Sequence, residues 1–376
     1  MKTRLRKIIF RFLILPVILL IILVFAATAV LYNQQPRLVA LAVRELNKKL
    51  PGKLIVGGSE ISVFQNYPYI SIAVKNVRLF ADKDTTGKTI FEAEKIFVGF
   101  NLTDVLNQQY RAKVILLKNG CMDIVKDNGR LNIMDALLSG QDSVPQTTDT
   151  TKALDFVLKK LVLKNMDISF FDKQSREQVH SHIDRIQSSF STDSLQMNAE
   201  LQGAMVLDYL WPGDSSLLRN KRLETDIKLS YHKSSGILSL QEGKLKLEDA
   251  MFNITGTADL LHNNQVDLKF SGDKTDFRQL FAFAPPKLAK ELKHFKYDGH
   301  LDFKGTVKGK LQGGNMPRID LYFSCKNGWL HNTESRRKLD SLAFKGFYTN
   351  GSKQSLQTSE LRLLDFNARP DKGIFK

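Results

Sequence analysis

An uncharged segment near the N-terminus, Phe12–Leu31, constrains this chain more than any other feature. Its 20 residues are nearly all apolar, and about 20 helical residues span the hydrocarbon core of a bilayer. Five basic residues and no acidic one precede it: Lys2, Arg4, Arg6, Lys7 and Arg11. Because basic flanks stay in the cytoplasm, the sequence predicts a cytoplasmic flank over residues 1–11, a single-pass transmembrane signal-anchor over residues 12–32, and export of the rest.

Two other interpretations of this segment stay open. Ala27-Thr28-Ala29 fits the small-residue cleavage site of a signal peptide, although the apolar stretch is long for one. The segment is also compatible with a helix buried in a protein core. Pro16 does not decide between them, because proline is tolerated in membrane helices. The anchor and the signal peptide both place the rest of the chain outside the cytoplasm.

The remaining composition is that of a folded, basic protein. Apolar residues make up 43% of the chain, so a sizeable core can form, and the net charge is +16. After the anchor the surplus of Lys and Arg is diffuse, which suits anionic lipid head groups. No basic stripe with interleaved aromatics is present, so we expect no nucleic-acid partner. Cys121 and Cys325 lie far apart and no CxxC motif occurs, so we expect two separate thiols.

Beyond residue 53, apolar residues recur at every second position. This alternation indicates antiparallel strands with one apolar and one wet face. The runs are Ile70–Val74, Ile227–Tyr231, Leu245–Leu247, Val266–Phe270 and Ile319–Cys325, with a further strand over Leu361–Phe366. Short helices are predicted at Pro36–Leu50, Leu102–Gln109, Asn132–Leu138 and Asp276–His294, with Pro36 at the first helical position of the first and Pro285-Pro286 breaking the last.

A polar stretch and a repeated dipeptide divide the chain further. Residues 139–152 have the composition of a flexible linker. Lys75-Asn76, Lys118-Asn119, Lys164-Asn165 and Lys326-Asn327 each follow an apolar run and precede another strand. The first three copies are 43 and 46 residues apart, which indicates a repeated hairpin-plus-helix unit and an elongated sheet, unless Lys-Asn is merely a common turn dipeptide.

The pattern suggests how the exported part is organised. We expect an N-terminal unit over residues 36–138, with its membrane-proximal helix, and further strand repeats over residues 153–376. A strand so close to the C-terminus would leave an open sheet edge. We therefore expect the chain to be an N-terminal portion of a longer protein, or to end where another unit stacks.

Several segments carry a resemblance to a known family. They are the basic anchor with the helix after it, Tyr67–Ile72, Val74–Val77, Ala93–Ile96, Leu102–Leu106, Ile115–Ile124 and Asp127–Asn132. Tyr297–Gly299, Gly305, Gly309 and Met316–Ile319 match later strand-rich repeats, whereas residues 180–223 match less clearly. The chain resembles the AsmA family of Gram-negative envelope proteins over nearly its whole length, by pattern rather than by a catalytic signature.

The resemblance implies a fold and a function. The fold is mostly β: an N-terminal transmembrane helix followed by an elongated, curved antiparallel β-sheet groove (a repeating β-groove, or β-taco) with a few short helices. The function is that of an inner-membrane protein whose bulk lies in the periplasm and conducts phospholipids between the inner and outer membranes, similar to the bridge-like lipid transfer proteins of eukaryotes. The implied partners are phospholipid, the inner membrane, and the outer membrane or its assembly proteins.

The expected site is a surface rather than a set of reactive groups. A one-sided sheet needs its apolar face covered, and acyl chains could cover it while head groups stay in water at the open slit. The residues expected to line this groove are Ile70, Ile72, Val74, Val266, Leu268, Phe270, Ile319, Leu321 and Phe323. Ordinary sheet core remains the alternative for each, since the sequence does not show which face curls inward.

The sequence predicts no catalytic or metal site. His180, His182 and Asp184 share one face of an expected strand, but an exposed polar face is the simpler interpretation. Asp82–Gly87 begins like a calcium loop, yet Ala93 stands where such a loop needs Glu. No GxSxG, P-loop or HExxH motif occurs, so we expect no enzyme, no cofactor and no metal. A non-enzymatic factor that supports outer-membrane protein assembly or envelope integrity through protein contacts stays open as the alternative.

Overall fold

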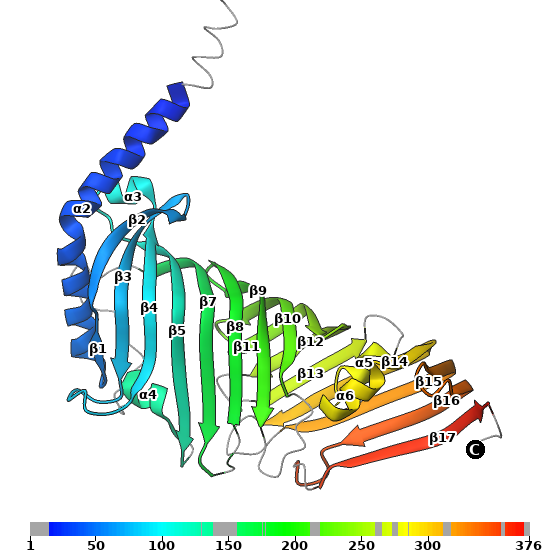
Figure 1. Ribbon diagram of the computed structural model, residues 1–376. Coiled ribbons are helices and arrows are strands. Elements are labelled where there is room, and N and C mark those ends of the chain that lie inside the picture. The colour runs from blue at the N-terminus through cyan, green and yellow to red at the C-terminus, as the bar shows by residue number, and fades with distance from the viewer. Residues whose placement is uncertain are drawn as a thin grey trace, which may run out of the picture. The chain divides into compact units, whose positions relative to one another are not determined.

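The computed structural model describes residues 15–128, 130–137, 156–174, 176, 178–210, 219–259, 265–272, 277–284, 286–310, 317–354 and 358–371. The fold is mostly β, with a few helices, and among the described residues hydrogen bonding joins 17 strands into one sheet (Figure 1). The chain divides into two compact units, residues 1–170 and 171–376. The mostly β fold class expected from the alternating pattern is therefore confirmed.

The first unit is built on the hydrogen-bonded strands that follow its N-terminal helix. They are β1 (Lys53–Ile55), β2 (Gly58–Asn66), β3 (Tyr69–Phe80), β4 (Thr89–Phe100), β5 (Ala112–Asp127), β6 (Arg130–Leu131) and most of β7 (Phe156–Asp172). β3 pairs antiparallel with β1 and β2 along one side and with β4 along the other, and β4 pairs antiparallel with β5. Two short helices, α3 (Leu102–Leu106) and α4 (Asn132–Leu137), begin where they are predicted and end slightly earlier.

The N-terminal helix α2 (Leu15–Lys49) runs without interruption for 35 residues. The prediction that a separate helix begins at Pro36 is therefore wrong, since Pro36 lies inside α2. Ala27 and Leu31 before the proline, and Leu38 and Val39 after it, belong to the same core cluster on the strands. Packing of both halves against one sheet offsets the hydrogen bond that proline cannot donate.

Within the described residues, no helix combines the length and the apolarity that a membrane span requires. Residues 1–14, which hold the basic flank and the start of the expected anchor, lie outside the described part of the chain. The predicted linker at residues 139–152 lies outside it as well.

Side chains of helix α2 also form hydrogen bonds with the sheet edge formed by β1 and β2. The Asn47 amide donates to the Leu54 carbonyl at 2.8 Å and accepts from the Leu54 backbone N–H at 2.7 Å. Gln35 Nε2 donates to the Ser59 carbonyl at 3.0 Å, and the Lys83 ammonium donates to carbonyls at the C-terminal end of α2. These side chains satisfy edge groups that would otherwise be available to another strand.

The Lys-Asn repeat has a structural cause. Asn76, Asn119, Asn165 and Asn327 all adopt a left-handed backbone conformation, with φ between 48° and 55°, which asparagine tolerates better than most residues. In the first unit, Asn165 Nδ2 donates to Asn119 Oδ1 at 2.9 Å, and Asn119 Nδ2 donates to Glu94 Oε2 at 2.5 Å. Two of the repeated asparagines, Asn119 and Asn165, thus link β4, β5 and β7 through their side chains.

The second unit is an antiparallel meander in which each strand pairs with the next. Its strands are β8 (Gln178–Thr192), β9 (Gln196–Leu210), β10 (Lys221–His232), β11 (Ile237–Leu247), β12 (Ala250–Asp259), β13 (Gln265–Gly272), β14 (Phe295–Lys310), β15 (Arg318–Asn332), β16 (Lys338–Thr349) and β17 (Glu360–Pro370). Helices α5 (Arg278–Phe281) and α6 (Pro286–Leu292) lie between β13 and β14 in sequence. The predicted break at Pro285-Pro286 is confirmed, and Pro286 begins α6.

Replacing Asn47 with Ala should loosen the contact between α2 and the sheet edge. Both hydrogen bonds to Leu54 disappear, so we expect the free energy of unfolding to fall by about 1–3 kcal/mol. Urea denaturation of the full chain in a non-ionic detergent measures the change. Lys48→Ala removes only an exposed ion pair with Glu45 and is the matched control. Equal losses in the two variants would contradict the role of Asn47.

Candidate functional site

The strands of the second unit present one continuous apolar face. Residues directly opposite each other on paired strands share a face, so the register identifies its members. One row runs from β8 to β17 through Ser188, Leu201, Ile227, Gly243, Ile254, Phe270, Gly305, Leu321, Tyr348 and Leu361. A neighbouring row holds Leu268, Val307 and Ile319. The face therefore extends across every strand of this unit.

All six groove residues predicted in this unit lie on the apolar face. They are Val266, Leu268 and Phe270 on β13, and Ile319, Leu321 and Phe323 on β15. Val266 is buried, and the other five are half-buried. The structure thus brings together two groups of residues that are far apart in the sequence, by placing β14 between their two strands.

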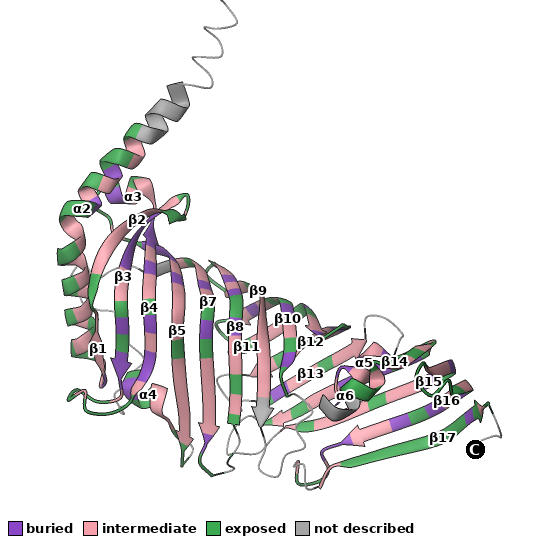
Figure 2. Cartoon of the chain, viewed as in Figure 1, coloured by how far each residue is buried: buried purple, intermediate pink, exposed green. Residues whose placement is uncertain are grey.

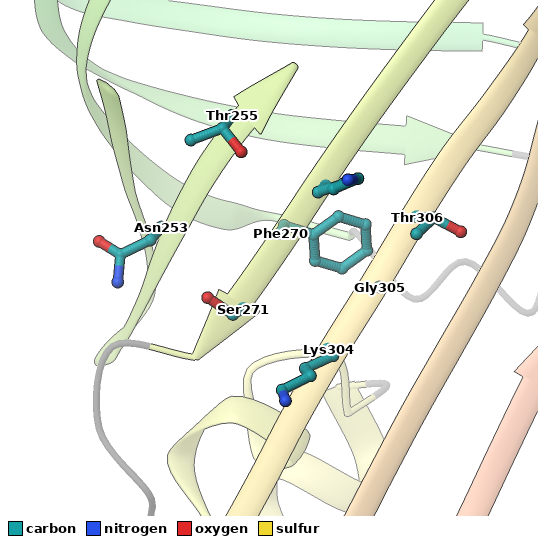
Figure 3. A pocket seen from close by; sticks show the side chains of 8 residues that line it. Asn253, Thr255, Phe270, Ser271, Lys304, Gly305 and Thr306 are labelled. Carbon is teal, nitrogen blue, oxygen red and sulfur yellow. The ribbon is translucent and has the colours of Figure 1, made fainter. Parts of the chain in front are cut away.

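Two aromatic rings on this face lie across glycines of the adjacent strand. A Cβ atom at Gly305 would lie 2.1 Å from the Phe270 ring, and one at Gly346 would lie 2.0 Å from the Phe323 ring. Figure 3 shows Phe270 next to Gly305. Only glycine leaves room for these rings, so each ring fills the space that a side chain of the next strand would otherwise occupy.

The opposite face is mainly polar on β12, β13 and β14, and on β15 and β16 it carries the aromatic pair Tyr322 and Phe347, with ring centroids 4.9 Å apart. Lys308 Nζ lies 2.9 Å from Asp267 Oδ2 on the neighbouring strand, and Tyr322 is 55% exposed. A shallow hollow of about 280 Å³ on β12, β13 and β14 is lined mainly by side chains of this face: Asn253, Thr255, Lys269, Ser271, Lys304 and Thr306, together with Phe270 and Gly305 (Figure 3). The strands are therefore amphipathic across the sheet.

Helix α5 and the residues next to it, Phe277–Phe283, cover part of the apolar face. Phe277 and Ala282 are buried in one cluster with residues of six strands, and Phe270, Leu321 and Phe323 pack against that cluster. Phe283 stacks on Phe303 with ring centroids 5.9 Å apart. The helical segment lies over β13 and β14 in Figure 1. Part of the face is thus covered by protein, whereas Leu361 and Leu363 on β17 remain 63% and 56% exposed.

In the first unit the predicted groove residues lie beneath a helix. Ile70 and Ile72 are only 1% and 3% exposed, because they pack in one cluster with Ala27 and Leu31 of α2; Val74 packs against the same cluster. Figure 2 shows the concentration of buried residues on β3 and β4. For these three residues the contacts are those of ordinary sheet core, the alternative that the sequence left open.

Sequence reasoning missed a second apolar cluster, on the opposite face of the same strands. It consists of Ala73, Phe97, Leu116 and Val162, all at most 5% exposed. Each of these residues lies next to an apolar residue of the first face, so the local sequence has no clean period of two. Runs such as Val114–Leu117 carried the signal, because strands that are apolar at successive positions are buried on both sides.

An ion-pair network crosses the edge of the first unit. Glu60 on β2 lies 2.6 Å from Lys75 Nζ on β3 and 3.0 Å from Lys95 Nζ on β4. Hydrogen bonds from Lys75 and then from Lys95 lower the pKa of the Glu60 carboxyl group. The carboxylate therefore links β2, β3 and β4 while it is ionised.

The described residues contain no group of three or more His, Cys, Asp or Glu side chains that could hold a metal ion. His182 lies 3.9 Å from Asp184, and Asp184 also pairs with Arg222 at 3.0 Å. Cys121 and Cys325 are both free thiols, the first exposed and the second buried. No family model matches this sequence, and no curated protein matches it either.

Replacing Gly305 with Ala tests the contact with the Phe270 ring. The added methyl group overlaps the ring, so we expect a loss of about 1–3 kcal/mol in the free energy of unfolding. In a Phe270→Ala background the same change should cost nothing, because the ring is absent. Chemical denaturation of the four proteins in a double-mutant cycle measures the coupling. Equal costs in both backgrounds would show that the ring does not occupy the glycine's space.

The Glu60 network predicts a pH-dependent contribution to stability. Because the folded-state pKa is lowered, the contribution is fully present above the unfolded pKa of about 4.3 and is lost as the pH falls through the folded value. We expect Glu60→Gln to be less stable than the parent at pH 7, with the difference shrinking at more acidic pH. Urea titrations at several pH values measure it, with exposed Glu291→Gln as the control. A difference independent of pH would exclude ionisation as its cause.

Proposed function

We propose that this protein is anchored in a bacterial inner membrane and binds phospholipids in the periplasm, conducting them along an apolar β-sheet face towards the outer membrane. The observation that carries the proposal is the continuous apolar face of the second unit, which has a mainly polar opposite face. An acyl chain in contact with that face gains about 0.8 kcal/mol per methylene removed from water. The resemblance to the AsmA family supports the same function.

The N-terminal segment would be the membrane anchor in this proposal. Ile22 and Phe25 on α2 are 58% and 76% exposed, which suits contact with lipid tails. Ala27 and Leu31, at the end of the same apolar segment, pack on the first unit. The helix would therefore leave the bilayer directly onto the sheet, which keeps the start of the sheet close to the membrane surface.

A second candidate function is the non-enzymatic support of outer-membrane protein assembly or envelope integrity through protein contacts. The observation that favours it is β17, which pairs with β16 along one edge. Leu361, Leu363, Leu364 and Phe366 on this strand are 40–63% exposed. A strand with exposed apolar side chains is suited to pairing with another protein. Under this alternative, protein partners rather than lipids would contact the second unit.

Site-specific photocrosslinking in cells tests the lipid proposal. We expect a photoreactive amino acid at Leu268 or Leu321 to form phospholipid adducts, because both side chains lie on the apolar face. The adjacent positions Lys269 and Tyr322 lie on the opposite face and are matched controls. Mass spectrometry of the purified crosslinked chain identifies the adducts.

The pattern of adducts separates the two candidate functions. Phospholipid adducts at Leu268 and Leu321, with few at the controls, would support transport along the face. Protein adducts at all four positions, without phospholipid, would favour the assembly factor. Absence of phospholipid adducts at both apolar positions would overturn the lipid proposal.

A further inference from the structure

A lysine interrupts the apolar face of the second unit. Lys221 at the start of β10 lies two residues before Leu223, so both side chains belong to the same face of the sheet. Lys221 is only 6% exposed, although lysine is almost never buried without an ionic partner. A charge at this place needs an explanation that ordinary sheet packing does not supply.

The hydrogen bonding of Lys221 is incomplete. Its ammonium group carries three donors, and Nζ donates to the Ala284 carbonyl at 2.9 Å. Among the described residues, no carboxylate lies within ion-pair distance of Nζ. Burial lowers the pKa of Lys221, and the nearby Glu248 raises it to a smaller extent. Glu248 Oε1 accepts from the Arg222 backbone N–H at 2.7 Å.

Lys221 lines a hollow of about 300 Å³ between the strands and the α5–α6 segment. Its lining includes two further cations, Arg278 on α5 and Lys293 after α6, and two carboxylates, Glu248 and Asp249, at the turn between β11 and β12. The apolar and aromatic part of the lining comes from Phe281, Ala282, Ala289, Leu292, Phe295 and Tyr297. The hollow therefore combines three cationic and two acidic side chains with an apolar lining.

We propose that this hollow binds a phosphate group, with Lys221 as the buried anchor and Arg278 and Lys293 at the rim. An anion would supply the acceptors that the Lys221 ammonium lacks, and the bond would be charge-assisted. Phe281 and Tyr297 of the lining also pack against the core cluster on the apolar face. Their rings meet edge-on, with centroids 4.9 Å apart. The site would thus accept a phosphate joined to an acyl chain and hold its head group where the chain enters the face.

This inference deepens the proposed lipid function and rests on it for the acyl chain. The phosphate could come from a lipid head group or from free phosphate, and separate probes distinguish them. The probes are dihexanoyl phosphatidylglycerol, inorganic phosphate, and dihexanoylglycerol, which lacks phosphate. Isothermal titration calorimetry on the full chain in a neutral detergent measures binding of each probe.

Lys221→Met tests the anchor. We expect it to weaken phosphatidylglycerol binding by about tenfold or more, because the charge-assisted bond is lost. Lys304→Met is the matched control, since Lys304 is an exposed lysine on the opposite face, and it should leave the affinity unchanged. Lys293→Met is the second variant: Lys293 is exposed, so the change leaves the core intact, and we expect a weakening of about threefold.

Each outcome decides the proposal. Binding of phosphatidylglycerol but not of dihexanoylglycerol, with a large loss in Lys221→Met, a smaller loss in Lys293→Met and none in Lys304→Met, supports a lipid head-group site. If inorganic phosphate binds as tightly as phosphatidylglycerol, and its binding also depends on Lys221, the hollow is a phosphate site that does not need the acyl chains. No binding of either phosphate probe, or equal loss in Lys221→Met and Lys304→Met, would overturn it. Crosslinking at Leu268 and Leu321 reports on the strand face instead, so failure here is distinguishable from failure of the lipid function.

Discussion

The apolar face of an antiparallel sheet has to be covered, and both units of this protein depend on how that is done. In the first unit, α2 and α3 cover the face that carries Ile70 and Ile72, and the cover is made of protein. In the second unit, α5 and the residues next to it cover only part of the face. The rest remains half-buried between neighbouring strands, with rings such as Phe270 lying over glycines. The difference between a covered and a partly open face is what separates a structural unit from a candidate binding unit.

Polar interactions at the strand edges complement this division. Asn47 and Gln35 bind the backbone of the edge strands, so α2 closes the edge as well as the face. Asn76, Asn119 and Asn165 adopt the left-handed backbone conformation in β3, β5 and β7, respectively. The side chains of Asn119 and Asn165 hydrogen-bond to each other and so connect β5 with β7. Lys221 differs from these polar residues because it places a charge on the apolar face of the sheet. Such departures are expected where a binding site, rather than stability, has selected the residue.

Much of this arrangement follows from the sequence. Alternation at Val266–Phe270 and Ile319–Cys325 correctly predicts strands, and it predicts that their apolar residues share a face. The tandem prolines at 285 and 286 correctly locate the break between α5 and α6. These features are local, since a period of two or a missing N–H acts within a few residues.

What the sequence could not reveal depends on contacts between distant segments. Pro36 suggests a helix start, but packing of Leu31 and Leu38 on the same strands keeps α2 continuous. Ile70 and Leu268 have the same alternating pattern, and only the tertiary fold puts one under a helix and leaves the other half-buried. The hollow at Lys221 combines residues of β10, α5 and β14, and no local pattern joins them.

Lipid mass spectrometry on the full chain, purified in a mild non-ionic detergent, tests the central claim most directly. The comparison needs two double variants, Leu268→Asp/Leu321→Asp on the apolar face and Lys269→Asp/Tyr322→Asp on the polar face. The account predicts that phospholipid co-purifies in a fixed ratio with the parent and with the polar-face variant, and that it is lost from the apolar-face variant. Equal phospholipid in all three proteins, or none in the parent, would contradict it.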